Sequence, residues 1–160
     1  MEKSLGHNLC EKIICYLHER AVDFEVRAHS PATTCEESAL KRKLPLQAGL
    51  KSVLFKSKDS FVLFSLRSHL KVNSNKVRKI LSCQRLRFAT DQELKQLAQV
   101  PKGGLPPFGP PLLPFKHYLD SSIDEYAEVA FNPGVLDQSI ILKTKTYLSL
   151  VAPVRTDFSQ

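Results

Sequence analysis

The sequence contains no long apolar segment. A helix that crosses a membrane needs roughly 18 or more apolar residues in succession, and no part of the chain approaches that length. The first twenty residues carry charged or polar side chains among their apolar positions, so they hold no continuous apolar core of a signal peptide; these are Glu2, His7, Glu11, Lys12 and His18. We therefore expect a cytoplasmic protein with no membrane partner.

Cysteine is also scarce. The four cysteines, Cys10, Cys15, Cys35 and Cys83, show neither the paired CxxC spacing of zinc sites nor the density of a disulfide scaffold. We expect reduced structural thiols, no bound metal and no other cofactor.

The common motifs of hydrolases are missing as well. The sequence has no GxSxG, no HExxH and no cluster of histidine with cysteine. Its five histidines are scattered at positions 7, 18, 29, 69 and 117, which favours surface or capping roles. His29 is the least clear of these, because it precedes a Ser30-Pro31 turn.

What is present is typical of a small globular protein. A chain of 160 residues with 42% hydrophobic and 24% charged residues matches one domain, here 1–160. A net charge of +7 and an isoelectric point of about 9.3 favour a polyanionic partner. Charge alone does not identify that partner.

Local patterns predict helices and strands along the chain. Ser4 is a candidate helix cap, and Thr34 with Glu37 and Thr90 with Glu93 match the capping box. Apolar spacing places helices at residues 5–20 and 73–81, and the two capping boxes place helices at residues 35–43 and after 90. Alternation and β-branched content place strands at residues 23–27, 50–55, 61–67, 85–89, 116–119, 128–132 and 138–143. The pair 50–55 and 61–67 is expected to form an antiparallel hairpin, and 146–151 is too short to classify.

Residues 101–114 contain six prolines and three glycines, so this segment must be an irregular loop. A linker between domains is one interpretation. However, the residues after Pro114 are predicted strands that need the preceding sheet. Gly103 and Gly104 can present backbone N–H groups to an oxygen, which makes an anion site one alternative and a loop that binds nothing the other.

Lys51 is an unusual residue because its predicted strand is apolar on both faces. Alternation places it on the same face as Val53 and Phe55. It is either a cation in a pocket or a side chain at the start of a strand that reaches water. Asp120 and Asp124 have no opposing carboxylate at a defined spacing, so a structural role is favoured for both.

Basic residues outside this strand are candidates for phosphate contacts, with an ordinary solvated face as the alternative. They are Lys41, Arg42, Lys43, Lys71, Lys76, Arg78, Lys79, Arg85 and Arg87.

Five blocks occur in the order found in a known family. They are residues 29–39 (HSPATTCEESA), 50–55 (LKSVLF), 103–109 (GGLPPFG), 118–122 (YLDSS) and 129–134 (VAFNPG). The chain resembles the YbaK/ProX deacylases over nearly its whole length. The resemblance implies an α+β fold with a mixed, largely antiparallel β-sheet flanked by helices, similar to the editing insertion of bacterial prolyl-tRNA synthetases.

The resemblance also implies an activity and partners. Relatives hydrolyse the ester bond of mischarged aminoacyl-tRNA, so tRNA is the expected partner and an aminoacyl-tRNA synthetase a further candidate. The alternative is a noncatalytic tRNA-binding or synthetase-docking module. No protein nucleophile is required if loop N–H groups polarise the ester carbonyl and Lys51 neutralises negative charge.

Site residues follow from the same resemblance. The catalytic group is Lys51, Gly103, Gly104 and Pro107, and the substrate-binding group is His29, Asp120, Asn132 and Gly134. The expected tRNA contacts come instead from the clusters of basic residues and are Lys41, Arg42, Lys43, Lys76, Arg78 and Lys79. Pro133 inside the Asn-x-Gly turn and the prolines after Gly109 depart from the family pattern and can reshape the pocket. The sequence therefore does not predict which amino acid is removed.

Overall fold

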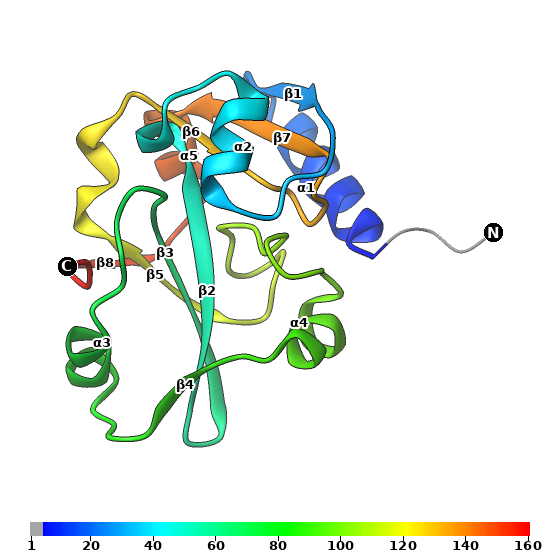
Figure 1. Ribbon diagram of the computed structural model, residues 1–160. Helices are drawn as coiled ribbons and strands as arrows, with labels where there is room; N and C mark the ends of the chain where they lie inside the picture. The colour runs from blue at the N-terminus through cyan, green and yellow to red at the C-terminus, as the bar shows by residue number, and fades with distance from the viewer. Residues whose placement is uncertain (1–4) are drawn as a thin grey trace.

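Two β-sheets organise the chain in the computed structural model, which describes residues 5–160 (Figure 1). The first is antiparallel with the order β1-β7-β6 and consists of β1 (Glu25–Ala28), β6 (Glu128–Phe131) and β7 (Gln138–Lys143). The second has the order β4-β2-β3-β5-β8 and consists of β2 (Leu50–Ser57), β3 (Ser60–Arg67), β4 (Leu86–Phe88), β5 (Lys116–Asp120) and β8 (Val154–Thr156).

The second sheet is mixed. β2 pairs antiparallel with β3 and β4, whereas β5 lies parallel to both β3 and β8. A parallel bridge between Gly49 and Ala130 joins the two sheets. This confirms the expected α+β fold, including the hairpin of β2 and β3.

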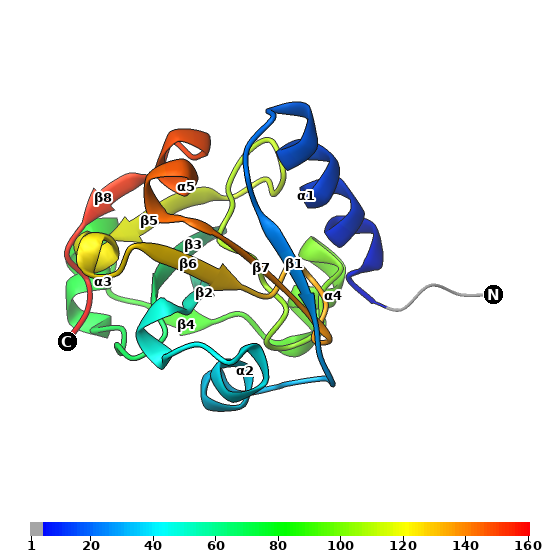
Figure 2. The same cartoon turned by 90° about the horizontal axis from the view of Figure 1, so that it is seen from above.

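Helices cover the sheets on more than one side. They are α1 (His7–Glu19), α2 (Cys35–Arg42), α3 (Ser74–Leu81), α4 (Asp91–Ala98) and α5 (Thr144–Leu150), with 3-10 turns η1 (Leu46–Ala48) and η2 (Ser121–Glu125). Seen from above, α1 and α5 lie on one side of the three-stranded sheet and α2 on the other (Figure 2). Among residues 5–160, no helix is long and apolar enough to cross a membrane.

The capping signals have mixed outcomes. Thr90 and Glu93 form the full capping box of α4. Thr34 caps α2 by accepting from Glu37 N at 3.1 Å, but the Glu37 carboxylate accepts from Thr33 N rather than from Thr34 N. Ser4 lies outside the described residues. The N-cap of α1 is Gly6, which has no side chain to cap with.

Two C-terminal elements escaped prediction. Residues 146–151, left unclassified, fall largely within α5, and the strand β8 was not expected at all. β8 is three residues long and two of these are exposed, so it carries no alternation pattern. Its position depends on pairing with β5, where Tyr118 faces Val154.

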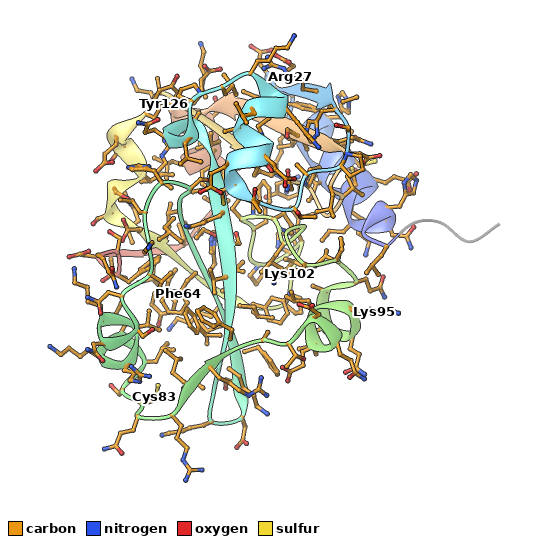
Figure 3. All side chains as sticks on the ribbon, in the orientation of Figure 1. Arg27, Phe64, Cys83, Lys95, Lys102 and Tyr126 are labelled. Carbon is orange, nitrogen blue, oxygen red and sulfur yellow. The ribbon has the colours of Figure 1, made fainter. Side chains whose placement is uncertain are left out.

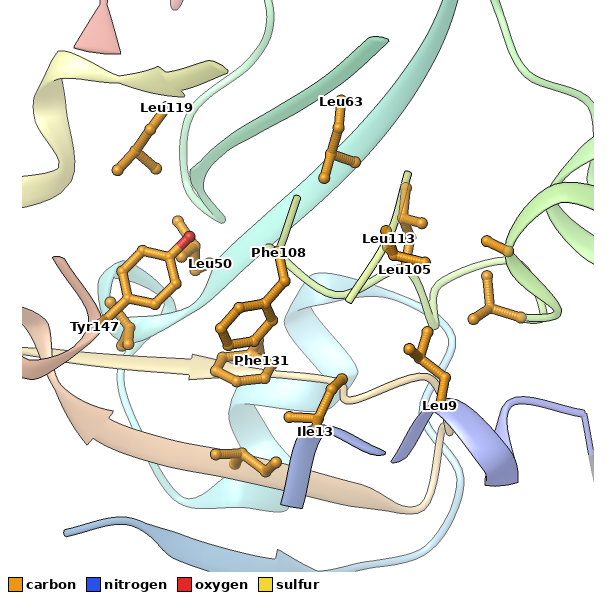
Figure 4. Close-up of a cluster of buried hydrophobic side chains, with 14 of the residues drawn as sticks. Leu9, Ile13, Leu50, Leu63, Leu105, Phe108, Leu113, Leu119, Phe131 and Tyr147 are labelled. Atoms are coloured by element: carbon orange, nitrogen blue, oxygen red, sulfur yellow. The ribbon is translucent and has the colours of Figure 1, made fainter. Parts of the chain in front are cut away.

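The proline-rich loop is part of the hydrophobic core. Leu105, Phe108 and Leu113 are buried and point into a cluster shared with Leu9 and Ile13 of α1 (Figure 4). The Phe108 ring also packs edge-on against Phe131 and Tyr147, with ring centroids 5.3 and 5.8 Å apart. The interpretation as a linker is therefore wrong, because these apolar side chains hold the loop against both sheets.

Arg67 secures the junction between the sheets. Its guanidinium is fully buried, and burial lowers its pKa. The group donates to Thr144 Oγ1 and to four backbone carbonyls, those of Ala48, Ile123, Tyr126 and Glu128. Removing Arg67 would leave these buried acceptors short of donors.

Candidate functional site

A small pocket of about 180 Å³ lies where α2, β2 and the proline-rich loop meet. Two cations line it, Arg42 and Lys51, and no carboxylate does. Hydroxyl groups supply much of the remaining polar surface, namely those of Thr33, Thr34, Ser38, Ser52 and Ser68. Such a lining suits a ligand that carries or develops negative charge.

Lys51 stands at the start of β2 and is half-buried. Its ammonium donates to the carbonyl of Ser68 at 3.2 Å and makes no ion pair with any of residues 5–160. Of the two alternatives for Lys51, the structure places the side chain in a pocket. The unpaired charge is available to a ligand.

Arg42 lies inside this site rather than on the expected basic surface. The side chain is buried, with 5% of its surface exposed, and donates from Nε to Ser139 Oγ at 2.6 Å and from Nη2 to Asn132 Oδ1 at 2.9 Å. Burial lowers the pKa of Arg42 to about 10. A phosphate contact at a solvated side chain is therefore ruled out for Arg42. Ser38 and Arg42 form the buried face of α2, a spacing of four that would have revealed this.

A hydrogen-bond network joins four of the predicted site residues, His29, Arg42, Asn132 and Gly103. Asn132 donates from Nδ2 to the Gly103 carbonyl at 2.9 Å. Arg42 donates to both Asn132 and Ser139 and so links these two residues. His29 Nε2 lies 2.8 Å from the same Ser139 hydroxyl. The network therefore runs from His29 to the loop. Ser139 had no sequence signal, because strand alternation alone does not distinguish it from a core position.

The loop presents only part of the predicted catalytic group to the pocket. Gly103, with a φ of 87°, lines the pocket, and its N–H has no partner among residues 5–160. The N–H of Gly104 donates to the Pro101 carbonyl at 2.9 Å and is thus not free to bind an oxygen.

Gly104, Pro107 and Gly134 lie behind the pocket and support it. A side chain on Gly104 would place its Cβ 2.9 Å from the Gly134 carbonyl oxygen, so the two backbones can approach only without side chains. The Pro107 carbonyl accepts a hydrogen bond from the buried Tyr147 hydroxyl at 2.6 Å. These contacts fix the position of Gly103.

Asp120 does not line this pocket, although the resemblance implied a substrate contact. It is 1% exposed and accepts hydrogen bonds from backbone or side-chain groups of Ser122, Phe158 and Ser159. Burial acts to raise the pKa of Asp120, but these hydrogen bonds outweigh it and the pKa is lowered. Asp120 joins η2 to the C-terminal segment, in line with the structural role favoured from spacing.

The other predicted tRNA contacts lie on the ends of α2 and α3. Lys43 and Lys79 are exposed and make no ion pair with any of residues 5–160. Lys76 pairs with Asp157 at 2.9 Å, and Lys41 donates to the Pro31 carbonyl. Figure 1 shows α2 and α3 in different parts of the molecule, so these residues do not form one patch.

A second basic surface was not anticipated as a unit. A groove of about 910 Å³ is lined by five cations and one carboxylate, which are Lys56, Lys58, Arg78, Arg85, Arg87 and Asp59. Arg87 is neutralised by Glu93, whose pKa it lowers to about 2. Lys58 and Arg85 make no ion pair with any of residues 5–160. Cys83 also lines this groove and lies at the bottom of the view in Figure 3, whereas Lys102, the sequence neighbour of Gly103, lies near the middle of the molecule.

Metal binding has no evident site in the described chain. Residues 5–160 contain no group of three histidine, cysteine, aspartate or glutamate side chains arranged to hold an ion. The four cysteines are free thiols, and Cys35 lines the pocket.

The aminoacyl-tRNA editing domain matches residues 29–150, which include the whole pocket. The chain belongs to the aminoacyl-tRNA editing domain family. Its relatives in this editing family include the multifunctional Ser/Thr-tRNA deacylase ProXp-y of Escherichia coli (strain K12), which is 29% identical over 98% of this chain and 96% of that protein.

Two further matches show how widely the editing domain is used. The proline--tRNA ligase of Bacillus subtilis (strain 168) is 34% identical over 52% of this chain, which corresponds to 15% of the ligase. A crystal structure of a candidate trans-editing enzyme for prolyl-tRNA synthetase superposes with a TM-score of 0.81 at 23% identity, covering 95% of this chain and 97% of the other. The latter match establishes the fold.

Proposed function

We propose that this editing domain is an aminoacyl-tRNA deacylase, which hydrolyses the ester between a wrongly attached amino acid and the terminal ribose of tRNA. Water adds to the ester carbonyl carbon, the bond from that carbon to the ribose oxygen breaks, and the products are the free amino acid and a tRNA with its hydroxyl restored. The observation that carries the proposal is a cationic pocket without carboxylates, containing Lys51, inside the editing domain.

In this proposal two groups stabilise the negative charge that develops on the carbonyl oxygen. The Lys51 ammonium has no carboxylate partner among residues 5–160, and the Gly103 N–H has no acceptor there. Donors that are held in place before the reaction stabilise a developing oxyanion at little reorganisation cost. We therefore assign catalysis to Lys51 and Gly103, with Asn132 holding the loop in position.

The pocket favours a short amino-acid side chain. Its volume of about 180 Å³ lies below the roughly 300–1,000 Å³ typical of sites for drug-sized ligands. Its several hydroxyl groups can hydrogen-bond to a polar side chain of the substrate. Serine and threonine satisfy both conditions, in keeping with the name of the E. coli relative.

We further propose that the basic groove binds the phosphates of the same tRNA. Lys51 and Lys56 belong to one strand, and five residues of β-strand span ~17 Å. Figure 1 shows β2 running from beside α2 down to the hairpin turn near β4. A tRNA whose acceptor end occupies the pocket can therefore reach the groove with its backbone, where Lys58 and Arg85 have no competing carboxylate partner.

The direct test uses the purified protein and a panel of mischarged tRNAs. Loss of the aminoacyl ester is followed with time for seryl, threonyl and alanyl esters and for a bulky phenylalanyl ester. We expect cleavage of small substrates and little cleavage of the bulky one. Binding of tRNA without cleavage of any ester would favour a noncatalytic module instead.

A further inference from the structure

A chain of three polar side chains crosses the larger sheet from the pocket. Ser52 lines the pocket, and its hydroxyl lies 2.8 Å from the Ser65 hydroxyl. Ser65 Oγ in turn lies 2.9 Å from His117 Nε2. Ser52 and Ser65 face each other across β2 and β3, and His117 belongs to β5 on the other side of β3. The chain thus links the pocket to a buried imidazole.

Burial keeps this chain away from competing partners. Ser65 is fully buried, His117 is 6% exposed, and burial lowers the pKa of His117 to about 4. At neutral pH the imidazole is therefore uncharged, so one ring nitrogen donates a hydrogen bond and the other accepts one. The tautomer decides which of these Nε2 does.

The other ring nitrogen faces a second cavity. His117 lines a space of about 340 Å³ with Tyr16, Phe108 and Leu112. Nδ1 has no hydrogen-bond partner among residues 5–160. In these residues the only fully buried side-chain nitrogen or oxygen without a partner is Arg67 Nε, so Nδ1 is not fully buried. Nδ1 therefore borders open space, where an N–H can donate to water. With the proton on Nδ1, Nε2 is the acceptor for the Ser65 hydroxyl.

The direction of the whole chain follows from an acceptor at Nε2. Each hydroxyl has one proton, so Ser65 donates to His117 and must accept from Ser52. Ser52 then donates to Ser65 and presents its oxygen lone pairs to the pocket. This adds a fixed acceptor to a pocket whose two charged side chains are both donors, whereas an aminoacyl ester carries an α-ammonium group.

We propose that His117 is a positioning residue which, through Ser65, holds the Ser52 hydroxyl as an acceptor for the α-ammonium group of the substrate. The proposal rests on the proposed deacylase function, since it takes the ligand to be an aminoacyl ester. Ser52 contacts the substrate, whereas His117 and Ser65 act only through it.

Kinetics of three variants test the chain. An α-ammonium contact is made equally before and during the reaction, so its loss raises KM and leaves kcat nearly unchanged. We expect Ser65→Ala and His117→Leu to raise KM about tenfold, the size of effect expected for one hydrogen bond to a charged group. His117→Gln should restore most of the affinity, because the glutamine amide oxygen can accept from Ser65. An unchanged KM in Ser65→Ala, with an active wild type, would overturn the proposal.

A double variant and a matched control separate positioning from a general structural effect. If His117 and Ser65 act through Ser52, then adding Ser65→Ala to Ser52→Ala produces no further rise in KM. Ser57→Ala removes another buried hydroxyl of β2 that is not part of the chain and should leave KM unchanged. Additive effects, or an equal rise in Ser57→Ala, would rule the mechanism out.

The tautomer provides a readout that does not depend on activity. Nitrogen NMR of the imidazole distinguishes a protonated Nδ1 from a protonated Nε2. We expect the proton on Nδ1 in the wild type, and a proton on Nε2 would overturn the proposal. If no tRNA ester is cleaved by the wild type, the deacylase proposal fails, whereas the NMR result still judges the direction of the chain.

Discussion

Arg42 Nη2 donates a hydrogen bond to Oδ1 of Asn132 over 2.9 Å. The Nδ2 group of the same Asn132 donates a hydrogen bond to the Gly103 carbonyl, so Asn132 connects Arg42 to the loop. A buried cation on α2 is therefore linked through Asn132 to the proline-rich loop. This polar link adds to the apolar contacts that hold the loop against the sheets.

Replacing that asparagine should loosen the loop. In Asn132→Ala, Arg42 Nη2 loses its acceptor and the Gly103 carbonyl loses its donor. We expect the free energy of unfolding to fall by about 1–3 kcal/mol and kcat to fall about tenfold or more, because Gly103 is no longer held in place. Chemical denaturation and single-turnover deacylation measure the two effects. Asn8→Ala, at an exposed asparagine of α1, is the control; wild-type kcat in Asn132→Ala would exclude the role assigned to the loop.

Lys51→Ala should abolish most of the activity without unfolding the protein. Removing one preorganised donor to developing charge lowers turnover by about 10² or more. The unfolding temperature should change little, since Lys51 makes one hydrogen bond and no ion pair within residues 5–160. Lys145→Ala, at an exposed lysine of α5, is the control. A folded Lys51→Ala protein with wild-type kcat would remove Lys51 from the mechanism.

Reversing charge in the groove should weaken tRNA binding more than reversing charge elsewhere. We expect Lys58→Glu with Arg85→Glu to reduce affinity at least tenfold and to lower the slope of log affinity against log salt by roughly 2. The matched control, Lys12→Glu with Lys145→Glu, changes net charge equally at exposed residues outside the groove. Binding is measured by filter retention across a salt series. Equal losses in both double variants would show that only net charge matters.

Acid should destabilise the wild type through His117. Burial lowers the pKa of His117 from 6.5 to about 4 in the folded protein, so between these values the unfolded chain binds a proton that the folded protein does not. Stability therefore falls as pH drops from about 6.5 to about 4, by at most about 3 kcal/mol. His117→Gln lacks this contribution. If the unfolding free energies of the wild type and of His117→Gln changed by the same amount between pH 6.5 and 4, the prediction would be contradicted.

Asp120→Asn should affect stability and not substrate binding. The carboxylate accepts several hydrogen bonds from buried groups, and the asparagine nitrogen cannot replace the acceptor it displaces. We expect unfolding to become easier by about 2 kcal/mol, with KM of the folded variant unchanged. A raised KM at wild-type stability would return Asp120 to the substrate site.

Local signals were sufficient for most elements of this fold. Thr90 and Glu93 form their capping box, the β2–β3 hairpin follows from two β-rich segments, and the proline-rich segment is irregular because proline lacks the N–H that regular structure needs. The family resemblance added residues that do meet at the pocket, among them Lys51, Gly103 and Asn132. The capping, hairpin and loop predictions need only the few residues on either side of each position, whereas the resemblance needs the order of five blocks along the chain.

Tertiary structure alone decided which polar groups face each other. Arg42 resembled its basic neighbours in sequence, yet its partner Ser139 lies 97 positions along the chain. The same holds for Asp120 with Ser159, for Ser65 with His117 and for the cations of the groove. A charged or polar side chain is found in water or in the interior according to whether the folded chain provides it with partners. Those partners come from strands and helices that are distant in sequence, so no local pattern reveals them.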